Sequence, residues 1–154
     1  MLDLTGQIAD LKREIAALVR ATDSQLTGIY GVATIVAGII LGQVGDVRRY
    51  PTRHHFATAN GTAPLPASSG RTVRHRLSRG GNRQLNRALY TIAITQIRAD
   101  TEGRAYYQRK RAEGKTKREA LRCLKRRLSD LVYRTMKADL ADQPSQEPSL
   151  VNAA

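Results

Sequence analysis

The sequence predicts an all-α fold: a coiled-coil helix at the amino end, a helix-hairpin-helix-like segment, a basic loop rich in glycine and serine, and a helical carboxyl part with a disordered tail. Apolar residues recur every three or four positions along most of the chain, as in amphipathic helices. Capping residues and glycines separate these stretches, and no stretch convincingly shows the alternation of a strand. We expect the coiled-coil helix over 1–22, one helical domain over 23–138 and the tail over 139–154.

The first expected helix carries an apolar seam with alternating spacings of four and three, formed by Leu4, Ile8, Leu11, Ile15 and Leu18. This spacing is that of the a and d positions of a coiled coil, whose seam is buried against a second helix. The pattern therefore predicts association with another chain. An amphipathic helix packed on its own domain is the alternative, because two and a half heptads do not separate the two.

A glycine-bearing turn over residues 28–33 precedes an apolar helix over residues 34–44. Gly28 and Gly31 permit a tight turn. Such a turn can offer backbone N–H groups to a phosphate, as helix-hairpin-helix modules do for DNA. A plain turn between two helices is the alternative interpretation.

A short helix is expected after Pro51 and Thr52, running through His54 to a stop near Gly61. The neighbouring His54 and His55 diverge on a helix, and no Cys or carboxylate lies at ligand spacing from them. We therefore interpret both histidines as surface or packing residues. No metal site made by this chain alone is expected.

The chain is strongly basic, with 26 Lys and Arg against 13 Asp and Glu and a formal net charge of +13. Between Arg71 and Arg134 there are 19 basic residues and 5 acidic ones. Most are Arg, whose planar guanidinium suits bidentate phosphate contact, and no long apolar helix face accompanies them. We therefore expect a nucleic acid as partner and no membrane. The most apolar run, residues 32–41, is too short to span a bilayer, which favours a soluble cytoplasmic protein.

Helical patterning resumes at Asn82 and continues to about Asp100, with Arg83, Asn86 and Arg87 near its start. Positive charge at the amino end of a helix opposes the helix dipole, which favours a phosphate at that end. Solvated charge is the alternative interpretation.

A last helix begins after Gly114 at the capping-box pair Thr116 and Glu119. Its expected buried stripe is Ala120, Leu121, Leu124, Leu128, Leu131 and Val132, and its opposite face carries Lys117, Arg118, Lys125 and Arg126. Cys123 is interpreted as a small, buried or half-buried helix residue. Beyond Asp139 the sequence has no periodicity, so we expect it to be disordered.

Several motifs follow one another along the chain: Gly61-Thr62-Ala63-Pro64, Ser68-Ser69-Gly70, the run from Arg76 to Asn86, Gly103-Arg104-Ala105-Tyr106-Tyr107 and Glu113-Gly114-Lys115-Thr116. Their order resembles the carboxyl-terminal domain of transposases of the IS110/IS116/IS902 family, over about residues 4–139. One departure is Ala33, since relatives usually have Gly-Val-Gly in the glycine turn.

The resemblance implies a helical domain that supplies a serine nucleophile. It places the nucleophile on Ser69, just before Gly70, with Ser68 as the alternative. In the family, a separate ribonuclease-H-like domain supplies four acidic, metal-binding residues, and the resemblance finds no counterpart of it in this sequence. We therefore expect Mg²⁺ to come from that missing domain, no cofactor to be bound by this chain alone, and the chain to be incomplete as an enzyme.

The residues expected to contact nucleic acid are Arg71, Arg74, Arg76, Arg79, Asn82, Arg83, Asn86, Arg109, Lys110, Lys125 and Arg126. A serine that attacks a DNA phosphate needs an exposed position, positive charge, and a base or metal to remove its proton. The basic loop supplies the first two.

Two functions are therefore expected. The chain is the DNA-binding part of a recombinase, guided in relatives by an element-encoded structured RNA, or it is a truncated, non-catalytic DNA- or RNA-binding module that pairs through its coiled coil with a full-length transposase. A third possibility is a tyrosine nucleophile, namely Tyr90, Tyr106 or Tyr107. The sequence does not show the His and Arg residues that accompany the tyrosine in enzymes of that kind. Tyr106 and Tyr107 are expected to pack or to stack on a base.

Overall fold

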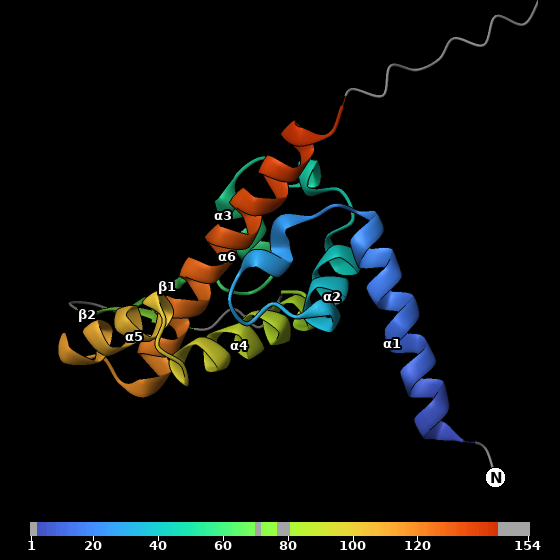
Figure 1. Ribbon diagram of the computed structural model, residues 1–154. Coiled ribbons are helices and arrows are strands. Elements are labelled where there is room, and N and C mark those ends of the chain that lie inside the picture. The colour runs from blue at the N-terminus through green and yellow to red at the C-terminus, as the bar shows by residue number, and fades with distance from the viewer. Residues whose placement is uncertain (1–2, 70–71, 77–80, 145–154) are drawn as a thin grey trace, which may run out of the picture.

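The computed structural model describes residues 3–69, 72–76 and 81–144. The elements in order are α1 (Leu4–Ala21), the 3-10 turn η1 (Gln25–Gly28), α2 (Thr34–Val44), the 3-10 turn η2 (Val47–Arg49), α3 (Arg53–Ala59), β1 (Leu65–Ser69), β2 (Thr72–Arg76), α4 (Arg83–Ile97), α5 (Glu102–Ala112) and α6 (Lys117–Asp142). The body is helical throughout, which confirms the all-α class (Figure 1). The two strands are confined to one hairpin.

Helix α6 is the longest element, and it packs on α3, α4 and α5. Four residues of the expected stripe are buried: Ala120, Leu124, Leu128 and Val132. Leu121 and Leu131 are partly buried and pack against the core, and Tyr133 and Met136 extend the buried face by one turn. The capping box is confirmed, because the Thr116 hydroxyl accepts from Glu119 N (3.2 Å) and the Glu119 carboxylate accepts from Thr116 N (2.8 Å). The bond from Thr116 N holds the pKa of Glu119 below its ordinary value.

The carboxyl end of α6 extends further than the sequence indicated. The helix continues to Asp142, so residues 139–142, which we expected in the tail, are helical. The cause is a long-range contact: Ser24 Oγ and Gln25 N donate to the Asp139 carboxylate, at 2.5 and 3.1 Å. Of the rest of the expected tail, residues 145–154 lie outside the described part of the chain.

Helices α2 and α4 pack against each other in the core. The glycine turn that leads into α2 is confirmed, since Gly31 has φ +91°, a conformation that favours glycine. It also lies against α4, where an added Cβ would be 3.2 Å from Ile92 O. Ala33 has an extended backbone with φ −82°, which any residue adopts. The departure from Gly-Val-Gly therefore imposes no strain on this turn.

Helix α5 was not expected from the sequence. Its only buried residue is Gly103, so it has no apolar stripe to detect. The Thr101 hydroxyl caps it by accepting from Arg104 N (3.1 Å), and Gly114 closes it with φ +93°. The missing side chain at Gly103 lets α4 approach, because a Cβ there would lie 2.0 Å from Gln96 Oε1.

Helix α1 lies along α2 only at its carboxyl half and extends away from the body (Figure 1). Ile15 packs against the core and lies beside Gly38. The other seam residues remain exposed, with exposed fractions of 65% for Leu4, 52% for Ile8, 57% for Leu11 and 69% for Leu18. Most of the expected seam is therefore uncovered in the single chain.

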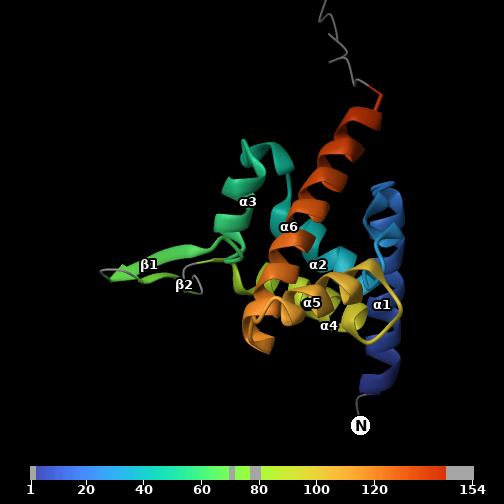
Figure 2. The ribbon, with the colours of Figure 1, turned by 90° about the vertical axis from the view of Figure 1, so that its left-hand side faces the viewer.

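The expectation that no segment forms a strand is wrong for residues 65–76. Strands β1 and β2 pair antiparallel, with Leu65 opposite Arg76 and Ser69 opposite Thr72. Figure 2 shows this hairpin projecting from the helical body. The sequences of the two strands, LPASS and TVRHR, lack the regular apolar alternation by which strands are detected, so the sequence carried no signal for them.

Candidate nucleic-acid interface and serine hairpin

The expected nucleophile lies at the outer end of the hairpin. Ser69 is the last residue of β1 and pairs with Thr72, the first residue of β2. Ser68 takes the next register position, opposite Val73. Both candidate serines are therefore carried at the end of the hairpin away from the body (Figure 2).

The arginines expected near the serine are placed in part. Arg74 and Arg76 belong to β2, where Arg76 pairs with the first residue of β1. Arg71 and Arg79 lie outside the described residues, as does Gly70. Two of the four arginines are thus built into the backbone of the hairpin that carries Ser69.

The two ends of the hairpin meet in a close backbone contact at its root. Asn82 N donates to Ala59 O at 2.6 Å. A Cβ on Gly81 would lie 2.3 Å from Gly61 N and 2.6 Å from Gly61 Cα. Because these are backbone atoms, they cannot swing aside, so residue 81 must be glycine. Gly61 itself has φ +76°. The point at which the hairpin leaves the body is therefore fixed.

A buried polar network supports this root from below. Asn60 and Ser129 are both fully buried, and Asn60 Nδ2 donates to Ser129 Oγ at 2.8 Å. Asn60 Oδ1 accepts from Thr62 N (3.1 Å) and Thr62 Oγ1 (2.6 Å). Asn86 Nδ2 donates to Asn60 O at 2.9 Å, and Lys125 Nζ donates to Asn86 Oδ1 at 2.5 Å. The network joins α4 and α6 to residues 60–62, which lead into the hairpin.

The prediction that Lys125 lies on the exposed face of α6 is wrong. Its exposed fraction is 8%, and burial lowers the pKa of its amino group. Ser129, one turn later, is buried beside it. The buried face of α6 is therefore wider than its apolar stripe and includes these two polar positions. Because Lys125 and Asn86 both form hydrogen bonds that stabilise the hairpin root, they are not part of the proposed interface.

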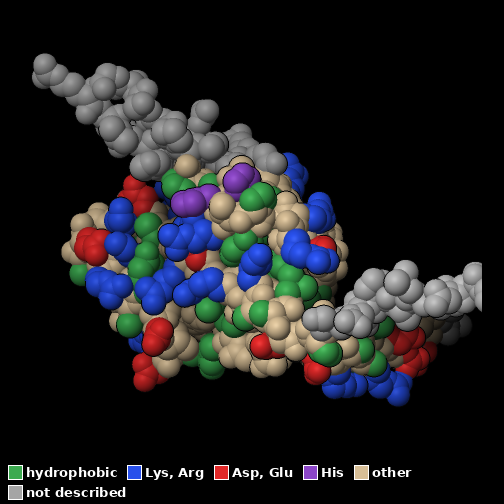
Figure 3. All heavy atoms as spheres, turned by 90° about the horizontal axis from the view of Figure 1, so that it is seen from above, with side chains coloured by type: hydrophobic (Ala, Val, Ile, Leu, Met, Phe, Trp, Pro, Cys, Tyr) green, Lys and Arg blue, Asp and Glu red, His purple; other side chains and the backbone are tan. Residues whose placement is uncertain are grey.

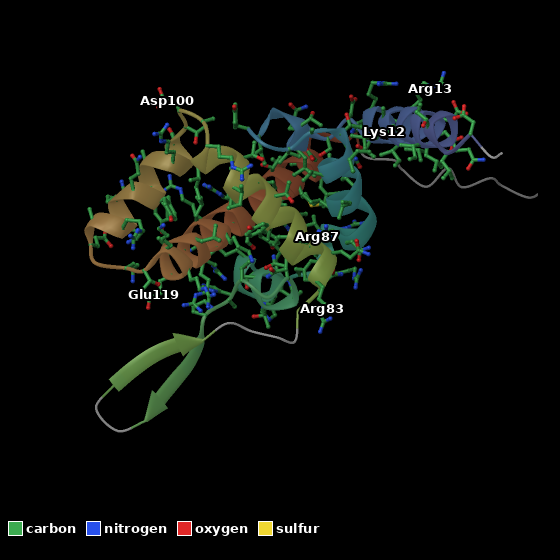
Figure 4. The ribbon with its side chains drawn as sticks, turned by 90° about the horizontal axis from the view of Figure 1, so that it is seen from below. Lys12, Arg13, Arg83, Arg87, Asp100 and Glu119 are labelled. Carbon is green, nitrogen blue, oxygen red and sulfur yellow. The ribbon has the colours of Figure 1, made fainter. Side chains whose placement is uncertain are left out.

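Two further expected residues, Asn82 and Arg83, stand at the start of α4, and Arg87 follows one turn later. Asn82 is its N-cap, because Asn82 Oδ1 accepts from Leu85 N (3.1 Å), and its amide donates to Gln43 Oε1 (2.9 Å). Arg83 and Arg87 are exposed one turn apart on α4, beside the point where the hairpin joins it (Figure 4). Among the described residues neither has an acidic partner within 4.0 Å. These two arginines are available to an anion.

Arg126 connects α6 to α3. Its Nη2 lies 3.0 Å from His54 Nδ1 and 3.4 Å from Asp130 Oδ1, while Arg53 lies 3.9 Å from Asp130 Oδ2. A guanidinium only donates, so His54 Nδ1 is the acceptor in this contact. Arg126 Nη1 is buried without a partner in the described structure. Figure 3 shows Lys and Arg side chains gathered on this face, with histidine next to them.

Arg109 and Lys110 lie in the last turn of α5, where positive charge favours the helix dipole. Both approach the ring of Tyr106, as does Arg127 of α6. Tyr106 and Tyr107 pack against the core, which confirms the packing alternative for them.

Among the residues that the structure describes, no group of three or more His, Cys, Asp or Glu side chains could hold a metal ion. In the same part of the chain, no helix combines the length and apolar character needed to cross a membrane. Cys123 is half-buried on α6 and unpaired, as expected.

The sequence has known relatives. A family model described as the transposase IS116/IS110/IS902 family matches residues 23–108, which is more than half of the chain. The chain belongs to this family. The matched range includes the glycine turn, the hairpin and α4, so the fixed root and the candidate serines lie inside the family's shared domain.

Three insertion-element proteins are similar to the chain. It is 41% identical over 125 residues to the uncharacterized 43.6 kDa protein of IS110 from Streptomyces coelicolor, covering 79% of the chain and 31% of that protein. It is 35% identical over 124 residues to the uncharacterized 42 kDa protein of IS900 from Mycobacterium paratuberculosis, covering 76% and 30%. It is 31% identical over 136 residues to the uncharacterized 44.8 kDa protein of IS116 from Streptomyces clavuligerus, covering 86% and 34%. The chain spans about a third of the length of these relatives.

Sequence reasoning missed several residues of this region: Asn60, Ser129, His54 as a partner of Arg126, and Arg127. One signal was present for the first of them. A polar residue stands beside a glycine at each end of the hairpin, in Asn60-Gly61 and in Gly81-Asn82. Such pairs are typical of points where a chain turns sharply. The other partnerships depend on tertiary packing and leave no local pattern.

Proposed function

We propose that this chain is the DNA-binding, serine-bearing part of an IS110-family transposase, with Ser69 as the nucleophile of DNA strand transfer and Ser68 as the alternative. The observation that carries the proposal is the place of Ser69 at the end of a projecting hairpin whose root is fixed. A nucleophile that attacks a DNA phosphate needs an exposed position near positive charge. Arg74 and Arg76 belong to the same hairpin and supply charge.

In the proposed step a bond forms between Ser69 Oγ and the DNA phosphorus, and the bond from phosphorus to one sugar oxygen breaks. The serine proton passes to a base, and the leaving sugar oxygen takes up a proton to become a hydroxyl. A strand hydroxyl reverses the step and releases the serine. Because the described residues contain no carboxylate cluster, the proposal assigns proton removal to groups outside this chain.

The same proposal assigns backbone contact with DNA to arginines of the hairpin and of the helices around its root. Phosphate contacts of this kind position a protein on DNA without reading sequence. The proposed set is Arg71, Arg74, Arg76, Arg79, Arg83, Arg87 and Arg126. A structured guide RNA is a further proposed partner of this basic face, since it offers the same phosphates.

The test compares Ser69→Ala with Ser68→Ala, two neighbouring changes of equal size. Each variant is mixed with element-end DNA and with the acidic domain of a full-length relative, and covalent protein–DNA adducts are detected on denaturing gels. We expect Ser69→Ala to form no adduct while binding DNA normally, and Ser68→Ala to form adducts. Adducts with Ser69→Ala would remove Ser69 from the mechanism, and their loss only in Ser68→Ala would move the role to Ser68.

A second function, a non-catalytic binding module that pairs with a full-length transposase, is favoured by the exposed seam of α1. Leu4, Ile8, Leu11 and Leu18 lie uncovered on one side of a helix that extends from the body. Isoleucine at a and leucine at d positions favour two parallel strands. We propose that α1 pairs with α1 of a second copy or with the corresponding helix of a full-length transposase.

Sedimentation velocity over a concentration series tests this pairing. Leu11→Lys places a charge in the seam, and Ala9→Lys places the same charge on the exposed outer face of α1. We expect the first variant to remain monomeric where the wild type and the Ala9→Lys control associate. A monomeric wild type at every concentration would contradict self-pairing.

A further inference from the structure

Tyr106 lies at the centre of a cluster of positive charge between α5 and α6. Arg109 Cζ is 5.2 Å from the centroid of its ring, Lys110 Nζ is 5.6 Å away, and Arg127 Cζ is 4.8 Å away. The ring is half-buried and packs against the core, so its position is fixed. Two helices thus bring three cations to one aromatic ring at the surface.

Only one of these charges has an acidic partner in the described structure. Lys110 Nζ donates to Glu113 Oε2 at 2.9 Å, which raises the pKa of Lys110 and lowers that of Glu113. Among the residues that the structure describes, Arg109 and Arg127 have no carboxylate within 4.0 Å. Attraction to the ring offsets part of the repulsion between the cations. A bound anion would offset the remainder.

We propose that Tyr106, Arg109 and Arg127 form a phosphate-binding site for the sugar-phosphate backbone of a nucleic acid, separate from the serine hairpin. Both arginines are exposed, so their guanidinium groups can donate to phosphate oxygens in the forked geometry that such groups prefer. Because cations lie over the ring, Tyr106 is not free to stack on a base. The contact is therefore to backbone and carries no base preference.

The position of the site gives it a role in the proposed function, on which this inference rests. Arg127 follows Arg126 on α6, and Arg126 contacts His54 of α3 near the hairpin root. Figure 3 shows Lys and Arg side chains gathered on one face of the molecule, with histidine next to them. A nucleic acid held at the hairpin can therefore extend over α6 to reach α5. The site would hold the strand or duplex beyond the segment that the serine attacks.

The test compares two double variants with the same loss of charge. Arg109→Ala/Arg127→Ala removes the proposed site, and Lys12→Ala/Arg20→Ala removes two exposed charges from α1, away from α5 (Figure 4). Fluorescence anisotropy across a salt series measures binding to labelled duplex DNA and to labelled stem-loop RNA. We expect the slope of log K against log salt to fall by about one unit for each phosphate that the first variant no longer neutralises, and to stay unchanged in the control. Lys110→Ala should weaken binding less than Arg109→Ala, since Lys110 is already paired.

The two probes identify the source of the phosphate. A slope change on DNA alone assigns the site to DNA, on RNA alone to a structured RNA, and on both to either backbone. Wild-type binding with equal slopes for the site variant and the control on both probes would overturn this site and leave the proposed function standing. Absence of salt-dependent binding by the wild type would instead overturn both. Circular dichroism of each variant verifies that it is folded.

Discussion

Replacing Asn60 with alanine tests whether the buried network stabilises the hairpin root. The Asn60 amide is fully buried and makes three side-chain hydrogen bonds, one to Ser129 and two from Thr62. Each contributes about 1 kcal/mol net, and the buried Ser129 hydroxyl loses its donor as well, so we expect Asn60→Ala to lower the free energy of unfolding by about 3 kcal/mol. Urea unfolding followed by far-UV circular dichroism measures this loss as a lower midpoint with an unchanged m value.

Ser129→Ala is the matched control for this prediction. It removes one of the three hydrogen bonds and leaves Asn60 Nδ2 without its acceptor, so we expect a smaller loss of about 1–2 kcal/mol. The double variant should lose less than the two single losses combined, because both remove the same bond. A loss below about 1 kcal/mol for Asn60→Ala, or strict additivity in the double variant, would refute the network as described.

Gly81→Ala should disrupt the hairpin root, since its Cβ would lie 2.3 Å from Gly61 N. We expect increased proteolysis within residues 61–81 and a lower melting temperature. Protease resistance equal to that of the wild type would contradict the close approach of the two backbones. Burial lowers the pKa of Lys125, so the unfolded chain holds that proton more tightly than the folded chain does. The stability of the wild type relative to Lys125→Met should therefore rise as pH increases towards about 10.4, the ordinary lysine pKa. A stability difference that does not change with pH in thermal melts would count against burial of the charge. The capping box lowers the pKa of Glu119, so its contribution to stability is fully present above the ordinary glutamate pKa and is lost as pH falls through the lowered pKa. Glu119→Gln should lack this loss of stability in acid. Identical profiles of stability against pH for the wild type and the variant would contradict the prediction.

The helices that were predicted correctly are those with a local signal. In α6 the capping pair Thr116 and Glu119 is followed by an apolar stripe, and both are visible in sequence alone. Helix α2 is mostly apolar, follows the turn at Gly31 and ends at Gly45. In each case, the residues that decide the structure lie within one or two turns of one another.

The features that were missed depend on contacts between distant residues. Helix α5 has no apolar stripe and is stabilised by its cap and by the close approach of Gln96 to Gly103. Lys125 appears as a surface residue in the helical pattern, and only its contact with Asn86, 39 residues away in the sequence, shows that it is internal. The candidate serine came from family resemblance, because Ser68-Ser69-Gly70 on its own is typical of an ordinary turn.

The most direct test of the account is the salt dependence of nucleic-acid binding by the chain and by Arg74→Ala/Arg76→Ala, a variant of the hairpin that carries Ser69. Fluorescence anisotropy with labelled duplex DNA gives the slope of log K against log salt for each protein. We predict tight, steeply salt-dependent binding by the wild type and a slope smaller by about one unit for each phosphate that the variant no longer neutralises. No binding by the wild type at low salt, or equal slopes for the two proteins, would contradict the claim that this hairpin engages the DNA backbone.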